Sequence, residues 1–150
     1  MFANVIVALS NFYGFRAACQ QNATQWDKFV LTNAICYSTL YHLAEKSKHN
    51  MTGFSIGGID DKVWLNYDRF FAALAVIRFL FAYRHLINVK IGAFGIASLG
   101  FMAISECQHV VDMSQYPISI TKPLYVITHV LWHIGAFHTA HLLLQAENKD

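Results

Sequence analysis

The sequence has 150 residues, of which 55% are hydrophobic and only 13% are charged, and its formal net charge at pH 7 is +2. Soluble domains carry about a quarter of their residues as charged side chains, so this composition argues against an ordinary water-soluble domain. The small net charge argues against nucleic acid as a partner.

Five apolar stretches follow one another along the chain, against the roughly 20 residues that a membrane-spanning helix needs. They cover residues 2–19, 28–46, 64–83, 89–105 and 121–145. The first lacks the basic start of a signal peptide, so we expect it to remain as a helix, although Arg16 leaves its apolar part short. The chain is therefore predicted to be a single all-α domain over residues 1–150. We expect a polytopic transmembrane helix bundle of about five spanning helices, integral to a membrane that the sequence does not identify.

Short polar segments separate these stretches. Gly57 and Gly58 mark turns before the third stretch, and the polar cluster from Arg84 to Lys90 predicts a tight turn after it. Pro123 is expected near the first position of the last helix, where its missing N–H costs nothing. The lysines and arginines near the helix ends divide four against five between the two predicted membrane faces, so the orientation is left open.

The last stretch carries four of the chain's eight histidines. His129 and His133 are four residues apart, which places them on one helix face at the spacing with which two imidazoles bind one metal ion. Polar side chains within a spanning helix are functional candidates by default, because hydrocarbon cannot hydrogen-bond to them. His138 and His141 do not share that face cleanly, and we expect them to make interhelical or lipid-boundary contacts.

Two other predicted helices place polar groups at a similar depth. Ser38 and His42 share a face near the end of the second helix, and Asp68 lies about one turn inside the third. With a rise of about 1.5 Å per residue, His42 and Asp68 each lie roughly 6 Å inside the boundary of their helix, and His129 roughly 9 Å. Because successive helices cross in alternating directions, these three helix ends meet at one face. The side chains are therefore predicted to converge.

This group has the composition of a zinc site. Three neutral imidazoles, from His42, His129 and His133, would leave the fourth tetrahedral position open for water, which is the pattern of catalytic zinc. Zinc lowers the pKa of its water towards about 7 and can polarise a carbonyl. Asp68 could hold the water or act as general base, and Ser38 could orient the water or the substrate carbonyl. Alternatively, Asp68 forms an interfacial ion pair with the arginine that follows it, and Ser38 is a small packing residue.

The same residues form an ordered set of motifs. Residues 38–42 read Ser-Thr-Leu-Tyr-His, Asp68 opens the next helix, and residues 129–133 read His-Val-Leu-Trp-His. This order resembles the CREST superfamily of membrane hydrolases, whose pattern is Ser-x-x-x-His in the second helix, Asp in the third and His-x-x-x-His in the last. The superfamily includes the alkaline ceramidases, the progestin and adipoQ receptors, the GPI-remodelling proteins and the myomaker-like proteins.

The resemblance implies three zinc ligands and two residues beside the metal, which are His42, His129 and His133, and Ser38 and Asp68. Glu45 is similar to the acidic residue that follows the motif histidine in the GPI-remodelling and myomaker-like branches. That similarity favours an ester-type phospholipid or GPI substrate over ceramide. The family has seven spanning helices where this chain has five, and the loss of two keeps the last helix parallel to the third.

The predicted function is a zinc-dependent intramembrane hydrolase that cleaves an amide or ester bond of a membrane lipid of the ceramide, phospholipid or GPI type. The alternative is a non-catalytic, receptor-like or fusion-type membrane protein that keeps the zinc site as a structural clamp. A di-iron desaturase or hydroxylase is disfavoured, because only the last helix is rich in histidine. Arg78, near the middle of the third helix, is costly there unless it is paired, and the sequence does not name its partner.

Overall fold

Within the described residues the secondary structure is almost entirely helical. The computed structural model describes residues 1–46, 51–107 and 118–147. In chain order the elements are α1 (Phe2–Ser10), η1 (Asn11–Gly14), α2 (Phe15–Ala18), α3 (Gln25–Ala44), α4 (Asp61–Ala82), η2 (Arg84–Leu86), α5 (Val89–Cys107) and α6 (Ile118–Glu147). Within these ranges, a longer non-helical connection joins α3 to α4. The predicted all-α class is confirmed. Most of the loop expected between the last two helices lies outside the described residues.

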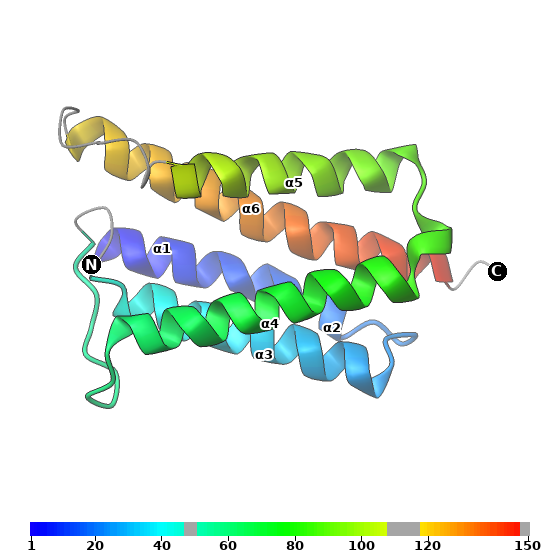
Figure 1. Ribbon diagram of the computed structural model, residues 1–150, viewed down its shortest axis with the longest axis horizontal. Coiled ribbons are helices and arrows are strands. Elements are labelled where there is room, and N and C mark those ends of the chain that lie inside the picture. The colour runs from blue at the N-terminus through cyan, green and yellow to red at the C-terminus, as the bar shows by residue number, and fades with distance from the viewer. Residues whose placement is uncertain (47–50, 108–117, 148–150) are drawn as a thin grey trace.

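The long helices lie side by side along one common direction, and the chain reverses at each connection (Figure 1). α1 packs against both α3 and α6, while α4 packs against α3 and α5 packs against α6. α4 and α5 are therefore the outer helices. α1 begins at one end of the bundle and α6 finishes at the other (Figure 1). We call the end where α1 begins the N-terminal end and the opposite end, where α6 finishes, the C-terminal end.

Local sequence explains where α3 and α4 begin. Thr24 and Asp27 form a capping box, in which the Thr24 hydroxyl accepts from the Asp27 N–H at 3.1 Å and the Asp27 carboxylate accepts from the Thr24 N–H at 2.9 Å. The Asp60 carboxylate caps α4 by accepting from the Lys62 N–H. Both helices begin about a turn earlier than the apolar pattern predicted, because their first turns are polar.

The predicted turn before α4 is confirmed. Gly57 and Gly58 adopt φ values of +61° and +72°, a conformation that side chains with a Cβ rarely accept. The prediction for Pro123 was wrong. α6 already begins at Ile118, so this proline occupies the sixth position and removes one backbone hydrogen bond from the second turn. The expected start at Thr121 therefore missed the residues Ile118 to Ile120, which belong to the first turn of the helix.

One helix among the described residues is long and apolar enough to cross a membrane, and the window that passes is Val89–Glu106 of α5. Only 17% of that window is buried, whereas the core helix of a water-soluble protein would be mostly covered. α4 is similarly bare: Phe79 is its one buried residue, and Phe81 is 72% exposed. Membrane insertion is therefore supported for α5 alone by length and composition. Five spanning helices remain a prediction.

The apolar core lies towards the C-terminal end of the bundle. Its members come from α2, the first half of α3, the last turn of α4, the start of α5 and the second half of α6, and they include Leu31, Ile35, Phe79, Phe137 and Leu144. At Gly14 of η1 the chain passes close to both α3 and α6, since a side chain there would collide with Ile35 and Phe137. The apolar core therefore lies away from the N-terminal end of the bundle.

Candidate metal centre

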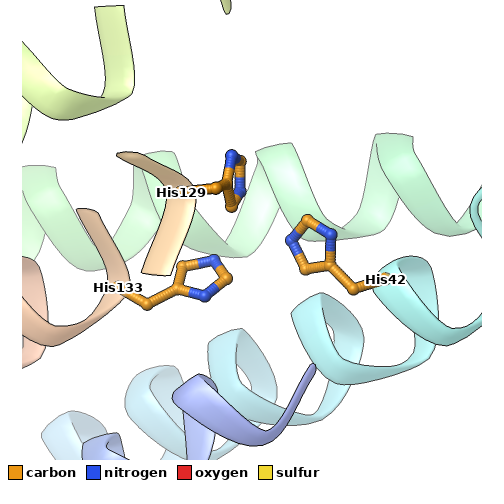
Figure 2. Close-up of side chains that lie close together, drawn as sticks. All are labelled: His42, His129 and His133. Carbon is orange, nitrogen blue, oxygen red and sulfur yellow. The ribbon is translucent and has the colours of Figure 1, made fainter. Parts of the chain in front are cut away.

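Three histidines converge near the N-terminal end of the bundle. His42 comes from the last turns of α3, and His129 and His133 come from successive turns of α6 (Figure 2). The ring centroids of His42 lie 4.6 Å from those of His129 and 5.1 Å from those of His133, and the two α6 rings are 4.8 Å apart. All three side chains are buried, and one ligand nitrogen from each lies within 4.8 Å of the others. The three histidines could therefore hold one metal ion.

The alternation of helix direction brings these residues together, as the depth argument predicted. α3 ends at the N-terminal end of the bundle, and α4 and α6 both begin there (Figure 1). Helical spacing does the rest, because residues four apart stack on one face. His129 and His133 point from α6 towards α3, and His42 points back towards them (Figure 2).

Ser10 contacts the outer nitrogen of His133. The Ser10 hydroxyl, on α1, donates to the Val7 carbonyl oxygen at 2.6 Å. Ser10 Oγ also lies 2.8 Å from His133 Nδ1, where it can accept a hydrogen from an Nδ1–H tautomer. In that tautomer His133 Nε2 carries the lone pair that a metal ion would use.

The same logic applies to His129 and His42. The Ser105 hydroxyl, on α5, donates to the Met102 carbonyl at 2.8 Å and therefore accepts from His129 Nδ1 at 3.2 Å. A Glu45 carboxylate oxygen accepts from His42 Nδ1 at 3.2 Å. Each ring thus has an outer partner at Nδ1, and the Nδ1–H tautomer of each would leave Nε2 as the ligand atom. Outer partners of this kind are what orient histidine ligands around a metal.

Ser38 and Asp68 lie beside this triangle, as predicted. Ser38 is buried on α3, and its Oγ is 3.3 Å from His133 Nε2. The same hydroxyl hydrogen-bonds to the Asp68 carboxylate, which reaches it from α4 and is half-buried. Asp68 is outside the group that could ligate the ion directly. It therefore stands next to the metal position, with Ser38 between.

The structure bears on the alternative interpretations of these two residues. Arg69, which follows Asp68, pairs with Glu106 of α5 at 3.3 Å, although its charge also acts on Asp68. Ser38 is no mere packing residue, since its hydroxyl contacts both His133 and Asp68. All five residues predicted for the site are brought together.

Sequence reasoning missed three residues that support the site: Ser10, Ser105 and Tyr125. The Tyr125 hydroxyl donates to both oxygens of the Glu45 carboxylate, at 3.1 and 3.0 Å. It stands four residues before His129, so helical spacing could have identified it. The two serines lie on helices without a motif, and nothing in their local sequence marks them.

The other flagged residues have partners far from the triangle. His138 Nδ1 is 3.0 Å from the Tyr13 hydroxyl, and His141 Nδ1 is 2.7 Å from Gln20 Nε2. The predicted interhelical contact is thus confirmed for His138, whereas the partner of His141 lies in the link between α2 and α3. Arg78 finds the partner that the sequence could not name: its Nε donates to a carboxylate oxygen of the buried Asp27 at 2.8 Å.

Comparison with known proteins adds one distant relative. The chain is 29% identical over 157 residues to an uncharacterised protein of Acanthamoeba polyphaga mimivirus, and the match covers 95% of this chain and 96% of that protein. Since the match spans nearly both chains, the two share their length as well as part of their sequence. No protein-family model and no solved structure matches the chain.

Proposed function

We propose that the protein is a zinc-dependent hydrolase that acts within a membrane on an amide or ester bond of a lipid. The observation that carries this proposal is the arrangement of three buried Nε2 acceptors, from His42, His129 and His133, around one point. Neutral imidazoles at this separation can present nitrogen lone pairs to one cation, which supports a metal site at this point.

The donor set fits zinc. Neutral imidazole nitrogens suit zinc, copper, iron and nickel, and three protein ligands with an open fourth position are typical of catalytic zinc, whereas structural zinc sites use four. Within the described residues, the group that could ligate the ion has three members. Bound there, zinc would supply Lewis acidity towards a carbonyl oxygen and activation of water.

Ser38 and Asp68 complete the chemistry. Asp68 is held in place by the Ser38 hydroxyl at the edge of the histidine triangle. From this position its carboxylate would accept the proton of the attacking water and return it to the leaving group. The Ser38 hydroxyl orients that carboxylate, and its contact with His133 would hold both side chains beside the metal position.

The lipid substrate is inferred from the protein surface and from the resemblance to the CREST superfamily. α4 and α5 expose large apolar side chains, with Phe70 59% and Ile96 73% exposed. An exposed apolar surface of this extent is typical of a membrane protein or of an interaction site. Glu45 is similar to the acidic residue that follows the motif histidine in the GPI-remodelling and myomaker-like branches. This similarity favours a phospholipid or GPI substrate over ceramide.

The test begins with the purified protein in detergent. We expect one zinc ion per chain by elemental analysis, and release of fatty acid from at least one of three lipids: a ceramide, a phospholipid or a GPI. His42→Ala should lose both the zinc and the activity. Asp68→Asn should keep the zinc and lose about 100-fold or more in rate, as expected for removal of a general base.

Two results would count against the proposal. Wild-type protein without stoichiometric zinc would contradict the metal site itself. Stoichiometric zinc with no hydrolysis of any of the three lipids, and with Asp68→Asn indistinguishable from wild type in function, would instead support the non-catalytic, receptor-like alternative.

A further inference from the structure

The Glu45 carboxylate is the most heavily contacted polar group around the histidine triangle. It is fully buried at the end of α3. It accepts from His42 Nδ1 at 3.2 Å and from the Tyr125 hydroxyl at 3.0 and 3.1 Å, and the Tyr41 hydroxyl also bonds to it. A carboxylate is costly to bury unless it is paired and hydrogen-bonded, so this arrangement needs a reason.

The backbone of Glu45 is held as firmly as its side chain. Asn4 Nδ2, on α1, donates to the carbonyl oxygens of His42 and Glu45 at 2.9 and 3.0 Å. The Gly53 N–H donates to the same Glu45 oxygen at 3.0 Å, and a side chain at Gly53 would collide with the backbone of Ala44. The position of the carboxylate is therefore set by α1, α3 and the following loop.

Tyr125 connects this carboxylate to the other two ligands. It lies on α6, four residues before His129, and the two rings are 5.1 Å apart between centroids. The bond from Tyr125 to Glu45 thus ties the end of α3, with His42, to the helix that carries both remaining histidines. It spans the metal position without contacting it.

The three outer partners are chemically unequal. His129 and His133 are each held by a serine hydroxyl, whereas His42 is held by a carboxylate. A carboxylate makes the opposite nitrogen a stronger donor to a metal than a hydroxyl does. The Glu45 carboxylate also places negative charge beside the site, which would offset part of the charge of a divalent ion in apolar surroundings.

We propose that Glu45 is a positioning residue that sets the metal affinity of the site through His42, and that Tyr125 keeps this carboxylate in register with the two ligands on α6. The inference rests on the proposed zinc site and deepens it. Neither residue touches the metal or the substrate. Their effect is carried by one imidazole.

The test compares Glu45→Gln, Tyr125→Phe and a matched control, Glu106→Gln, in the full-length protein. Glu106→Gln removes the same charge from an exposed ion pair with Arg69. Zinc affinity is measured by competition with a chromogenic chelator, and the visible spectrum of the Co²⁺-substituted protein reports on ligand geometry. We expect Glu45→Gln to weaken zinc binding about 10- to 100-fold and to change the Co²⁺ spectrum.

Tyr125→Phe should weaken binding in the same direction but less, because Glu45 remains. Glu106→Gln should bind zinc as wild type does. Adding Tyr125→Phe to Glu45→Gln should cause little further loss, since both act through the same carboxylate. This double variant distinguishes a shared role from two separate packing defects, and circular dichroism confirms that each variant is folded.

Equal zinc affinity and an unchanged Co²⁺ spectrum in Glu45→Gln would overturn the inference. So would an equal loss in Glu45→Gln and Glu106→Gln, which would indicate a general effect of charge. If Glu45→Gln does not fold, Tyr125→Phe decides alone: wild-type affinity in that variant overturns the inference. These failures differ from failure of the proposed function, in which wild-type protein itself binds no zinc or hydrolyses no lipid.

Discussion

Two buried polar clusters occupy opposite ends of this bundle, and they are built differently. At the C-terminal end, the buried carboxylate of Asp27 accepts from Arg78 Nε at 2.8 Å, from the Tyr83 hydroxyl at 2.6 Å and from the Thr24 hydroxyl at 2.6 Å. We call this the Asp27 cluster. At the N-terminal end, three imidazole acceptors face one another.

The difference lies in complementarity. In the Asp27 cluster one acceptor meets several donors, and a negative charge meets a positive one, so the group is satisfied by the chain itself. In the histidine cluster three imidazoles, each with an outer partner at Nδ1, bring ligand nitrogens within 4.8 Å of one another and could hold a cation. Burial of polar groups is common to both ends. The presence of an internal counter-charge at one end and of a possible ligand set at the other distinguishes the two clusters.

The largest expected effect is on stability, and it comes from a substitution in the Asp27 cluster. Asp27→Asn keeps the side-chain shape but removes the charge that pairs with Arg78, which is only 27% exposed. We expect the free energy of unfolding to fall by about 3 kcal/mol, the lower end of the range for breaking a buried pair. Chemical denaturation in detergent measures this loss. Zinc content of the folded protein should stay at the wild-type value.

The exposed pair of Arg69 and Glu106 is the control for that variant, because its side chains are 58% and 40% exposed. Glu106→Gln should change the free energy of unfolding by less than about 1 kcal/mol. If Asp27→Asn instead removed zinc while leaving stability intact, the two ends of the bundle would be coupled and the division between structure and function would be wrong.

A smaller effect is expected from the serines that hold the ligands. Ser105→Ala removes the acceptor of His129 Nδ1–H, and Ser10→Ala removes that of His133. We expect each to weaken zinc binding by about 10-fold, the low end for loss of an outer partner, measured by chelator competition. Ser98→Ala is the matched control on α5, because its hydroxyl bonds only to the Phe94 carbonyl among the contacts described. Unchanged affinity in both variants would contradict the assigned tautomers.

The sequence predicted the centre of the site better than its surroundings. His42, His129 and His133 were identifiable because imidazole is a common metal ligand and helical spacing can be read from nearby residues. The alternation of helix direction follows from the order of the helices alone. Ser10 and Ser105 were not, because a serine on a helix without a motif is identical in sequence whether it faces a ligand or another helix. Their roles depend on how α1 and α5 pack against α6, which local pattern does not encode.

The fold shows the same limit. The order of the helical segments was predictable from the apolar stretches, although the first stretch divides into α1, η1 and α2. Helix starts were placed late at α3 and α4, and Pro123 was placed at the wrong position in α6. Polar first turns and capping residues carry no apolar signal. Arg78 is the clearest case: the sequence showed that it needed a partner, and only the packing of α4 on α3 supplied Asp27.

The smallest expected effect concerns the second histidine pair of α6. His138 and His141 resemble the Asp27 cluster in that each meets a polar partner supplied by the chain, the Tyr13 hydroxyl and the Gln20 amide. His141→Ala should therefore leave zinc content and affinity at wild-type values, and should lower the free energy of unfolding by about 1 kcal/mol for one lost hydrogen bond. His129→Ala, on the same helix, should lose the metal. Loss of zinc from both variants would show that α6 holds one continuous histidine site, and the contrast between the two ends of the bundle would not stand.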